Sequence, residues 1–98
     1  MSTVLYVYDV KKGKQRDPRR TLFNKELFGY KYKWLTKEGP KEKFRLGLLQ
    51  RYKAKRIGDS VISVNLEFSS FFDELFRIFN DVISVRKFLV EKEIFLNY

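Results

Sequence analysis

An apolar stripe, mostly of phenylalanine, near the C-terminal end constrains the fold of this chain more than any other sequence feature. Its six side chains recur at i, i+3, i+4, i+7, i+8 and i+11, which is the spacing of one face of an α-helix. They are Phe68, Phe71, Phe72, Leu75, Phe76 and Phe79. The pattern predicts a helix over residues 69–81, with Ser70 and Asp73 spaced as an approximate capping box at its start.

Start and stop signals predict a second helix nearer the N-terminus. Asp17 is a preferred N-cap residue, Pro18 suits the first helical turn, and Gly29 is a common residue just past a helix end. The residues expected to face inward from this helix are Leu22, Phe23, Leu27 and Phe28.

Runs of β-branched and aromatic residues predict the strands. Residues 3–10 are expected to form an opening strand that is buried on both faces. Residues 30–36 alternate aromatic side chains with lysine at the period of a strand. The other predicted segments are a turn at 37–40, a returning hairpin strand at 43–49, a basic connection at 50–56, a strand at 56–64 that is strongest from Ser60, and a closing strand at 82–90.

The resulting order, β-α-β-β-β-α-β, predicts an α+β fold. Outer strands that flank two helices form the ferredoxin-like pattern, here with an inserted basic β-hairpin. A chain of 98 residues has room for a single modest core, so we expect residues 1–98 to form one domain. The tail at 91–98 is rich in large apolar residues and is expected to dock against the body or a partner.

Composition excludes several classes of function. The chain has no Cys, which excludes disulfides, thiolate metal sites and thiol nucleophiles, and no His, the commonest general base. No apolar run is long enough to cross a membrane, and the first ten residues lack the features of a signal peptide. We therefore expect a cytoplasmic protein with no metal and no cofactor.

Charge is distributed unevenly along the chain. Residues 11–56 hold 17 of the 21 Lys and Arg residues and four acids, a net charge of +13. Residues 57–98 hold four bases and seven acids, a net charge of −3, and the whole chain carries +9. A basic block joined to a mildly acidic half indicates a surface that meets a polyanion.

The start of the first helix is a predicted phosphate site. Basic residues occupy its first turn, where the helix dipole favours acids, and more of them precede it. Free backbone N–H groups, the positive helix end and several cations would together hold a phosphate, whereas the alternative is a solvated basic loop. The residues of this expected site are Lys11, Lys12, Lys14, Arg16, Arg19 and Arg20.

The first hairpin strand has two interpretations. In one, Tyr30, Tyr32 and Trp34 form a platform on which bases stack. In the other, which we favour, these rings face the core, and Lys31 and Lys33 on the opposite face bind phosphates. The positive strip would then continue through Lys37, Lys41, Lys43, Arg45, Arg51, Lys53, Lys55 and Arg56.

Signals of enzymatic activity are weak. The loop at 11–16 lacks the Gly-Lys-Ser/Thr ending of a phosphate-binding loop, and serines such as Ser60 and Ser63 have no His to activate them. Asp9 ends the first strand, where we expect it to cap the following loop. The sequence therefore predicts a protein that is not an enzyme.

Parts of the chain resemble two known families. The run from Val4 to Val10 resembles the first strand of the CRISPR-associated Cas2 proteins, which are ferredoxin-like and about this long. That resemblance implies a role for Asp9 in metal-dependent nuclease activity across a dimer, although the long basic hairpin departs from the pattern of that family. Three other segments, 27–34, 56–62 and 72–76, resemble a family of short basic crenarchaeal proteins, largely uncharacterised, that includes an archaea-specific accessory protein of the large ribosomal subunit.

The sequence thus predicts non-enzymatic binding of structured RNA through backbone phosphates by a ribosome-associated protein of the large subunit, with ribosomal RNA as the partner. The alternatives are a metal-dependent dimeric nuclease and a chromatin-type DNA-binding protein. Phosphate contacts alone do not distinguish RNA from DNA. The oligomeric state stays open, with a homodimer as one alternative.

Overall fold

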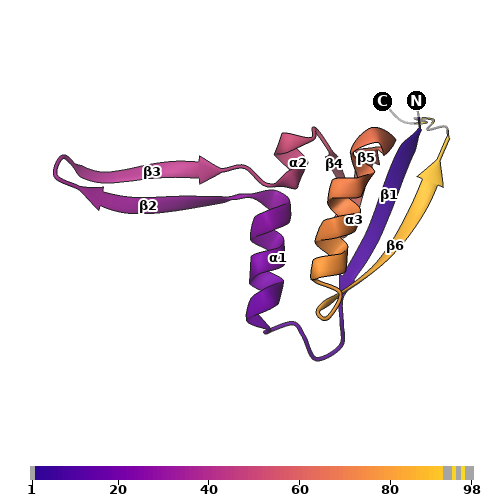
Figure 1. Cartoon of the computed structure of the whole chain (residues 1–98), viewed down its shortest axis with the longest axis horizontal. Coiled ribbons are helices and arrows are strands. Elements are labelled where there is room, and N and C mark those ends of the chain that lie inside the picture. Colours follow the sequence, from indigo (N-terminus) through magenta and orange to yellow (C-terminus); the bar gives the residue numbers. More distant parts are fainter. Residues whose placement is uncertain (1, 92–93, 95, 97–98) are drawn as a thin grey trace.

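The computed structural model describes residues 2–91, 94 and 96, and it has an α+β architecture with an antiparallel main sheet. The order of this four-stranded sheet is β4-β5-β1-β6. The central strand β1 (Thr3–Val10) pairs with β5 (Val61–Asn65) and with β6 (Ile83–Val90), and β4 (Lys55–Gly58) lies at one edge (Figure 1).

A separate two-stranded sheet projects from the body. Its strands, β2 (Tyr30–Thr36) and β3 (Gly39–Arg45), extend away from the four-stranded sheet and the helices, so no other element covers them along most of their length (Figure 1). This arm accounts for the elongated shape of the molecule, which measures 53 × 35 × 26 Å.

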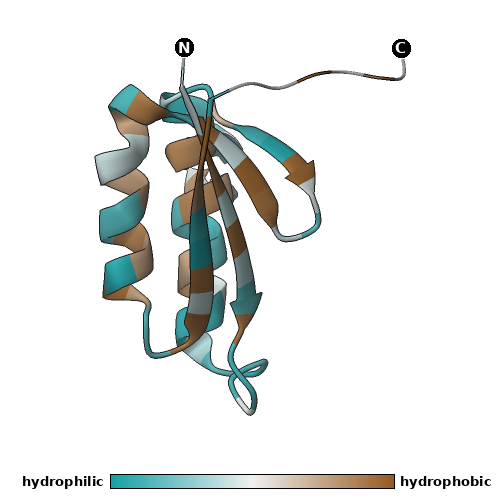
Figure 2. Ribbon diagram, turned by 90° about the vertical axis from the view of Figure 1, so that its right-hand side faces the viewer, coloured by the Kyte–Doolittle hydropathy of each residue, from teal (hydrophilic) through white to brown (hydrophobic). Residues whose placement is uncertain are grey.

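The two longer helices, α1 (Pro18–Phe28) and α3 (Ser69–Ile78), lie on the same side of the main sheet (Figure 2). A short helix, α2 (Leu48–Arg51), follows the hairpin, and a 3-10 turn, η1 (Leu66–Phe68), leads directly into α3. Within the described part of the chain, none of the helices combines the length and the apolar character that a membrane crossing requires.

The element order differs from the predicted one after the hairpin. Residues 50–56 are not a plain connection, because they contain the end of α2 and the start of β4. Two strands, β4 and β5, therefore lie between the hairpin and α3, where the sequence predicted one. The second hairpin strand also begins earlier than expected, at Gly39 instead of Lys43. The reason is a two-residue turn at Lys37 and Glu38, which brings Gly39 directly opposite Thr36.

The opening strand is buried on one face only. Val4, Tyr6 and Tyr8 are buried beneath the helices, whereas Leu5 and Val7 on the other face stay partly exposed. The prediction of burial on both faces is wrong because α1 and α3 cover the same side of the sheet.

Aromatic rings from three elements meet at the centre of the core. The ring centroid of Phe76, on α3, lies 5.2 Å from that of Tyr6, 5.7 Å from Tyr8 and 5.6 Å from Phe23 on α1. These separations lie in the favourable range for aromatic pairs. The stripe on α3 is buried as predicted at Phe72, Leu75, Phe76 and Phe79, while Phe71 remains 46% exposed.

Asp73 joins α3 to the sheet instead of capping the helix. It lies beyond the first turn, and its Oδ1 accepts a hydrogen bond of 2.6 Å from the Tyr6 hydroxyl, while Oδ2 accepts one of 2.8 Å from the Lys87 ammonium. Partial burial opposes ionisation of Asp73, but these hydrogen bonds hold its pKa below the usual value. Burial raises the pKa of Tyr6, so this hydroxyl stays protonated. The predicted capping box at Ser70 and Asp73 is therefore wrong.

Two glycines fix the base of the hairpin where its strands leave the body. Gly29 has a φ of +78°, and a Cβ there would lie 2.5 Å from the carbonyl oxygen of Arg45. A Cβ on Gly47 would lie 2.5 Å from the carbonyl oxygen of Leu27. Gln50 ties the same two segments together, because its Nε2 donates to the Phe28 carbonyl at 2.8 Å and its Oε1 accepts from the Gly47 N–H at 2.9 Å.

This close approach predicts that Gly47→Ala destabilises the protein. The new methyl group would collide with backbone atoms that cannot move independently, at a cost of about 1–3 kcal/mol in the free energy of unfolding. Gly58→Ala is the matched control, because the nearest atom to its added Cβ is a side-chain methyl of Val61 at 3.5 Å. Denaturant unfolding of the two variants checks the prediction, and equal stabilities would contradict it.

Candidate nucleic-acid interface

The hairpin register sorts its residues onto two faces. Residues directly opposite each other on paired strands project to the same side of the sheet. The aromatic face holds the pairs Tyr30 with Arg45, Tyr32 with Lys43, and Trp34 with Lys41. The lysine face holds the pairs Lys31 with Phe44, Lys33 with Glu42, and Leu35 with Pro40.

The rings on the aromatic face are exposed rather than part of the core. Tyr32 is 38% exposed and Trp34 is 42% exposed, because the arm projects from the body and no layer covers it. Their rings stack on each other with centroids 5.5 Å apart. Tyr30, nearer the body, is half-buried, and the Lys25 ammonium lies 5.1 Å from its ring centroid. The favoured prediction that these three rings face the core is therefore wrong.

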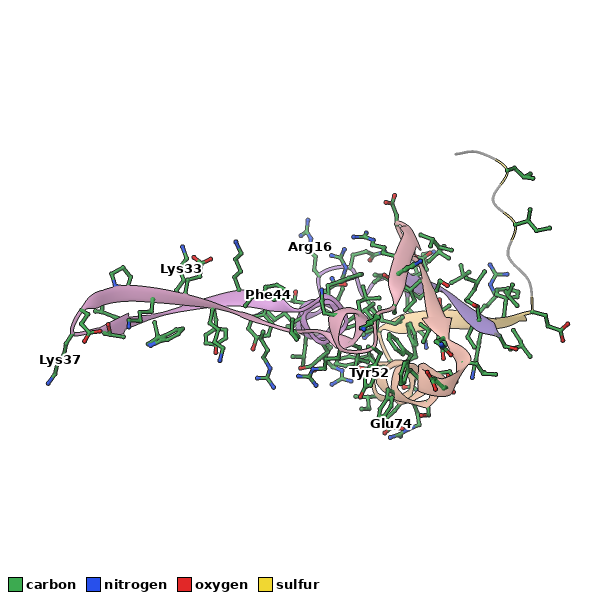
Figure 3. The ribbon with its side chains drawn as sticks, turned by 90° about the horizontal axis from the view of Figure 1, so that it is seen from above. Arg16, Lys33, Lys37, Phe44, Tyr52 and Glu74 are labelled. Atoms are coloured by element: carbon green, nitrogen blue, oxygen red, sulfur yellow. The ribbon has the colours of Figure 1, made fainter. Side chains whose placement is uncertain are left out.

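A carboxylate partly neutralises the lysine face. The ammonium groups of Lys31 and Lys33 lie 3.5 Å and 3.8 Å from the two oxygens of Glu42, which projects between them from β3. Figure 3 shows Lys33 pointing away from the ribbon on this side of the arm. The expected binding face thus carries its own counter-charge.

The aromatic face carries three cations and no acid. Among the described residues, no carboxylate lies within ion-pairing distance of Lys43 or Arg45. Lys41 lies 3.3 Å from Glu38, an 81% exposed side chain in the turn at the tip. The predicted positive strip is therefore divided, since Lys41, Lys43 and Arg45 project to the side opposite Lys31 and Lys33.

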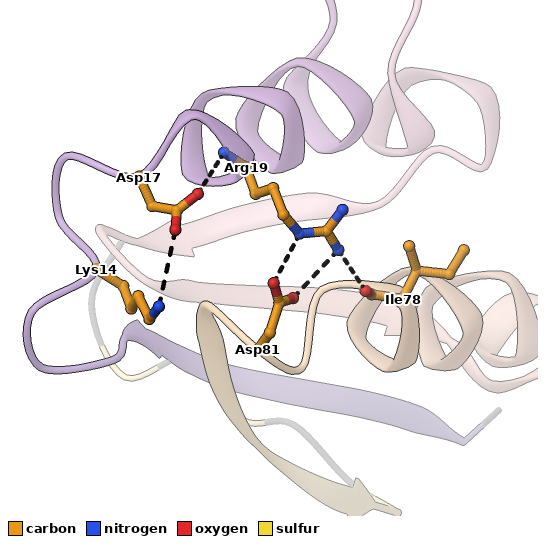
Figure 4. Close-up of polar contacts among 5 residues, drawn as sticks. All are labelled: Lys14, Asp17, Arg19, Ile78 and Asp81. Atoms are coloured by element: carbon orange, nitrogen blue, oxygen red, sulfur yellow. Dashed lines mark hydrogen bonds and ion pairs between the residues drawn. The ribbon is translucent and has the colours of Figure 1, made fainter.

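The N-terminus of α1 confirms the predicted cap but changes the role of Arg19. Asp17 accepts a hydrogen bond of 2.9 Å from the Arg19 N–H, as an N-cap residue should. The Arg19 guanidinium donates to the two Asp81 oxygens at 2.7 and 3.1 Å and to the Ile78 carbonyl at 2.7 Å (Figure 4). It also lies 4.7 Å from the ring centroid of Phe79. The side chain that we expected to meet a phosphate instead ties α1 to the end of α3.

The other cations of this expected site remain at the surface. Arg20 donates to the Gln15 carbonyl at 3.1 Å, and the Lys14 ammonium lies 3.9 Å from Asp17. The remaining exposed cations of the loop are Lys11, Lys12 and Arg16. The loop precedes α1 and the hairpin follows it, so the two basic regions lie at opposite ends of a helix about 16 Å long.

A third group of cations lies near the base of the hairpin. Arg51, Lys53 and Lys55 are exposed on α2, the following turn and β4. Arg56 is used within the fold, since its guanidinium donates to the carbonyl oxygens of Gly58 and Asp59 and lies 5.0 Å from the ring centroid of Phe28. Arg19 and Arg56 thus differ from the other predicted cations, because contacts with an aromatic ring and with several oxygens of the fold hold their guanidinium groups at the surface.

Asp9 makes a local hydrogen bond within β1 and, among the described contacts, none to the following loop that we expected it to cap. Its Oδ1 accepts a hydrogen bond of 2.9 Å from the Val10 N–H at the end of β1. It lines a shallow cavity of about 560 Å³ together with Ser60, Ser84 and Arg86. In the described part of the chain, no three acidic side chains come together as a metal site.

The two described apolar side chains of the tail do not dock against the body. Ile94 is 66% exposed and Leu96 is 85% exposed, so neither side chain packs against the body. The expectation of docking for Phe95 and Tyr98 concerns positions outside the described residues.

Comparisons with known proteins returned no matching family model, no matching curated protein and no matching solved structure. The function is therefore inferred from the geometry of the arm and from the charges that it carries.

The contacts of Arg19 predict a pH-dependent loss of stability in Arg19→Ala. The hydrogen bonds from Arg19 hold the pKa of Asp81 below its usual value. A depressed folded pKa stabilises the protein above the unfolded pKa of about 3.9, and this stabilisation is lost as the pH falls through the folded pKa. The difference in unfolding free energy between wild type and variant should therefore be larger at neutral pH than in acid, where only the lost contacts with the Ile78 carbonyl and the Phe79 ring remain.

Arg20→Ala is the control for this experiment, because it removes the same charge but only one hydrogen bond, to the Gln15 carbonyl. Urea unfolding across the acidic range provides the measurement. A gap between wild type and Arg19→Ala that is independent of pH would contradict the assigned role of the ion pair.

Proposed function

We propose that this chain is a non-enzymatic RNA-binding protein whose main contact surface is the projecting hairpin. The observation that carries the proposal is the aromatic face, where three cations and three rings share one side of an exposed arm without an acid. Such a combination suits a polyanion that also offers flat apolar groups.

Electrostatics supports phosphate contact as the main source of affinity. Residues 30–45 contain six bases and two acids, a net charge of +4 on an arm that solvent surrounds. The basic loop at residues 11–16 and the cations around α2 add two further positive regions on the body. Phosphate contacts of this kind position a protein on nucleic acid and make its affinity depend on salt.

We infer further that the main sheet is ferredoxin-like, with the hairpin as an insertion after its first helix. Support comes from the connections, since the crossover containing α1 leads from β1 to β4 past β5, and the one containing α3 leads from β5 to β6 past β1. Two such split crossovers define this arrangement.

We also propose that the RNA is ribosomal and that the protein is an accessory component of the large subunit. A small body with an extended basic arm suits an RNA surface on which the arm follows backbone phosphates. In extracts of the native cells, the protein should sediment with large ribosomal subunits at low salt and be released at high salt. Sedimentation as a free protein at every salt concentration would contradict the ribosomal assignment.

The faces of the hairpin should respond differently to charge removal. Lys43→Ala with Arg45→Ala should weaken RNA binding at least tenfold. Plotted as log affinity against log salt concentration, the negative slope should become shallower by roughly 1.4, if each cation neutralises one phosphate of a single strand. Lys31→Ala with Lys33→Ala removes the same charge and is the matched control. It should have the smaller effect, because Glu42 already neutralises part of that face.

Fluorescence anisotropy with labelled RNA, read at several salt concentrations, measures both quantities. The four side chains are exposed, so the melting temperatures of both variants should stay close to that of the wild type. Equal losses of affinity in the two double variants would show that the aromatic face has no special role, and an affinity indifferent to salt would contradict phosphate contact altogether.

A further inference from the structure

We propose that Tyr32 and Trp34 stack against unpaired bases, so that the hairpin prefers a single-stranded stretch of RNA to a duplex. This inference rests on the proposed function and goes further, because it names the form of nucleic acid and the two side chains that select it. Backbone contacts alone would accept single strands and duplexes alike.

The rings of Tyr32 and Trp34 are open to a ligand. These two large aromatic side chains, 38% and 42% exposed, lie next to each other on an arm that no other layer covers. They stack with ring centroids 5.5 Å apart and an interplanar angle of 26°, so one face of each ring lies against the other. The outer faces and outward edges of the pair form an exposed apolar ledge. Exposed aromatic faces bind nucleobases without regard to sequence, because every base has a π-face.

Cations accompany the rings on the same face of the hairpin. Lys43 lies directly opposite Tyr32, and Lys41 lies directly opposite Trp34. Each ring therefore has a cation beside it, as a base has a phosphate beside it in a nucleotide. The ring–cation pair recurs after two residues, about 6.8 Å along the strand, so successive nucleotides of an extended strand can occupy successive pairs.

A duplex offers these rings fewer base faces for stacking than a single strand does. In a paired helix the bases stack on one another, and the deep narrow major groove of A-form RNA keeps side chains from reaching their edges. The rings would then face sugars and phosphates and gain nothing from stacking. An unpaired loop or single strand exposes the base faces that the ledge can cover.

Charge also opposes a second copy of the chain as the occupant. Face-to-face pairing of two aromatic faces would bring Lys41, Lys43 and Arg45 of one copy against the same cations of the other. Like charges placed opposite each other oppose association. A polyanion is complementary to this face, whereas the same face of a second copy is not.

The only tryptophan of the chain provides a direct test, because Trp34 alone reports tryptophan fluorescence. Three probes would be titrated at equal phosphate concentration: single-stranded oligouridylate, a fully paired RNA duplex, and inorganic polyphosphate, which has charge but no bases. The single strand should quench the emission of Trp34. The duplex and polyphosphate should bind, as measured by anisotropy competition, without comparable quenching.

Variants separate stacking from folding. Tyr32→Leu and Trp34→Leu should each weaken single-strand binding by about tenfold, as expected for the loss of one base–ring stack, and leave duplex binding unchanged. Trp34→Phe should restore most of the affinity, which would show that the ring matters. Phe44→Leu is the matched control, since it removes a ring of equal exposure, 42%, from the lysine face and should not change single-strand affinity.

The results that overturn the inference are distinct from those that overturn the function. Salt-dependent RNA binding without quenching, equal quenching by polyphosphate, or full single-strand affinity in Tyr32→Leu and Trp34→Leu would refute stacking and leave RNA binding in place. Trp34 emission that changes with protein concentration alone, together with a dimer in sedimentation, would assign the face to a second copy. Failure to bind any of the three probes would overturn the proposed function itself.

Discussion

The packing of Phe76 against β1 and α1 is the interaction on which the rest of the structure depends. Its ring packs against those of Tyr6, Tyr8 and Phe23, and so joins both long helices to the central strand. Only Gly29 separates the end of α1 from the start of the hairpin, so the position of the arm follows from how α1 is held. Leu27 anchors the last turn of α1, because its side chain is fully buried. The close approach of Gly29 to Gly47 then holds the base of the arm against this end of the helix.

Local patterns predict the two long helices and the outer strands of the chain, but they miss α2 and β4 and say little about what surrounds each element. The cap at Asp17 and the helix that begins at Ser69 depend on spacing within a few residues, which the sequence contains, although the helix ends at Ile78 and not at the predicted residue 81. The roles of Arg19 and Asp73 depend on partners 62 and 67 residues away, Asp81 and Tyr6, and no local pattern identifies such partners. The sequence therefore assigns an acid or a base near a helix start to the helix dipole or a cap, whereas the fold uses both side chains to join elements.

The candidate site on the hairpin was also predictable only in part, because its surroundings decide which face is exposed. Alternation at a period of two establishes that residues 30–36 have an aromatic face and a lysine face, but it does not say which face another layer covers. Here neither face is covered by a second layer, because α1 and α3 both pack on the main sheet. The assignment of Lys41, Lys43 and Arg45 to the aromatic face was within reach of the sequence. A two-residue turn at 37–38 places Trp34 opposite Lys41, and this register determines the face on which each of the remaining pairs lies.

The charge arrangement of the arm also bears on its own stability. A two-stranded hairpin is marginally stable at best in water, and six cations on one arm repel each other. Glu42 lies between Lys31 and Lys33, and Glu38 pairs with Lys41, so the two acids of the hairpin lower the repulsion on the lysine face and at the tip. Lys43 and Arg45 gain no such relief from a described carboxylate, and they lie beside the exposed rings. A bound polyanion would supply the missing counter-charge where the free arm lacks it, and by mass action it would stabilise the arm as it binds.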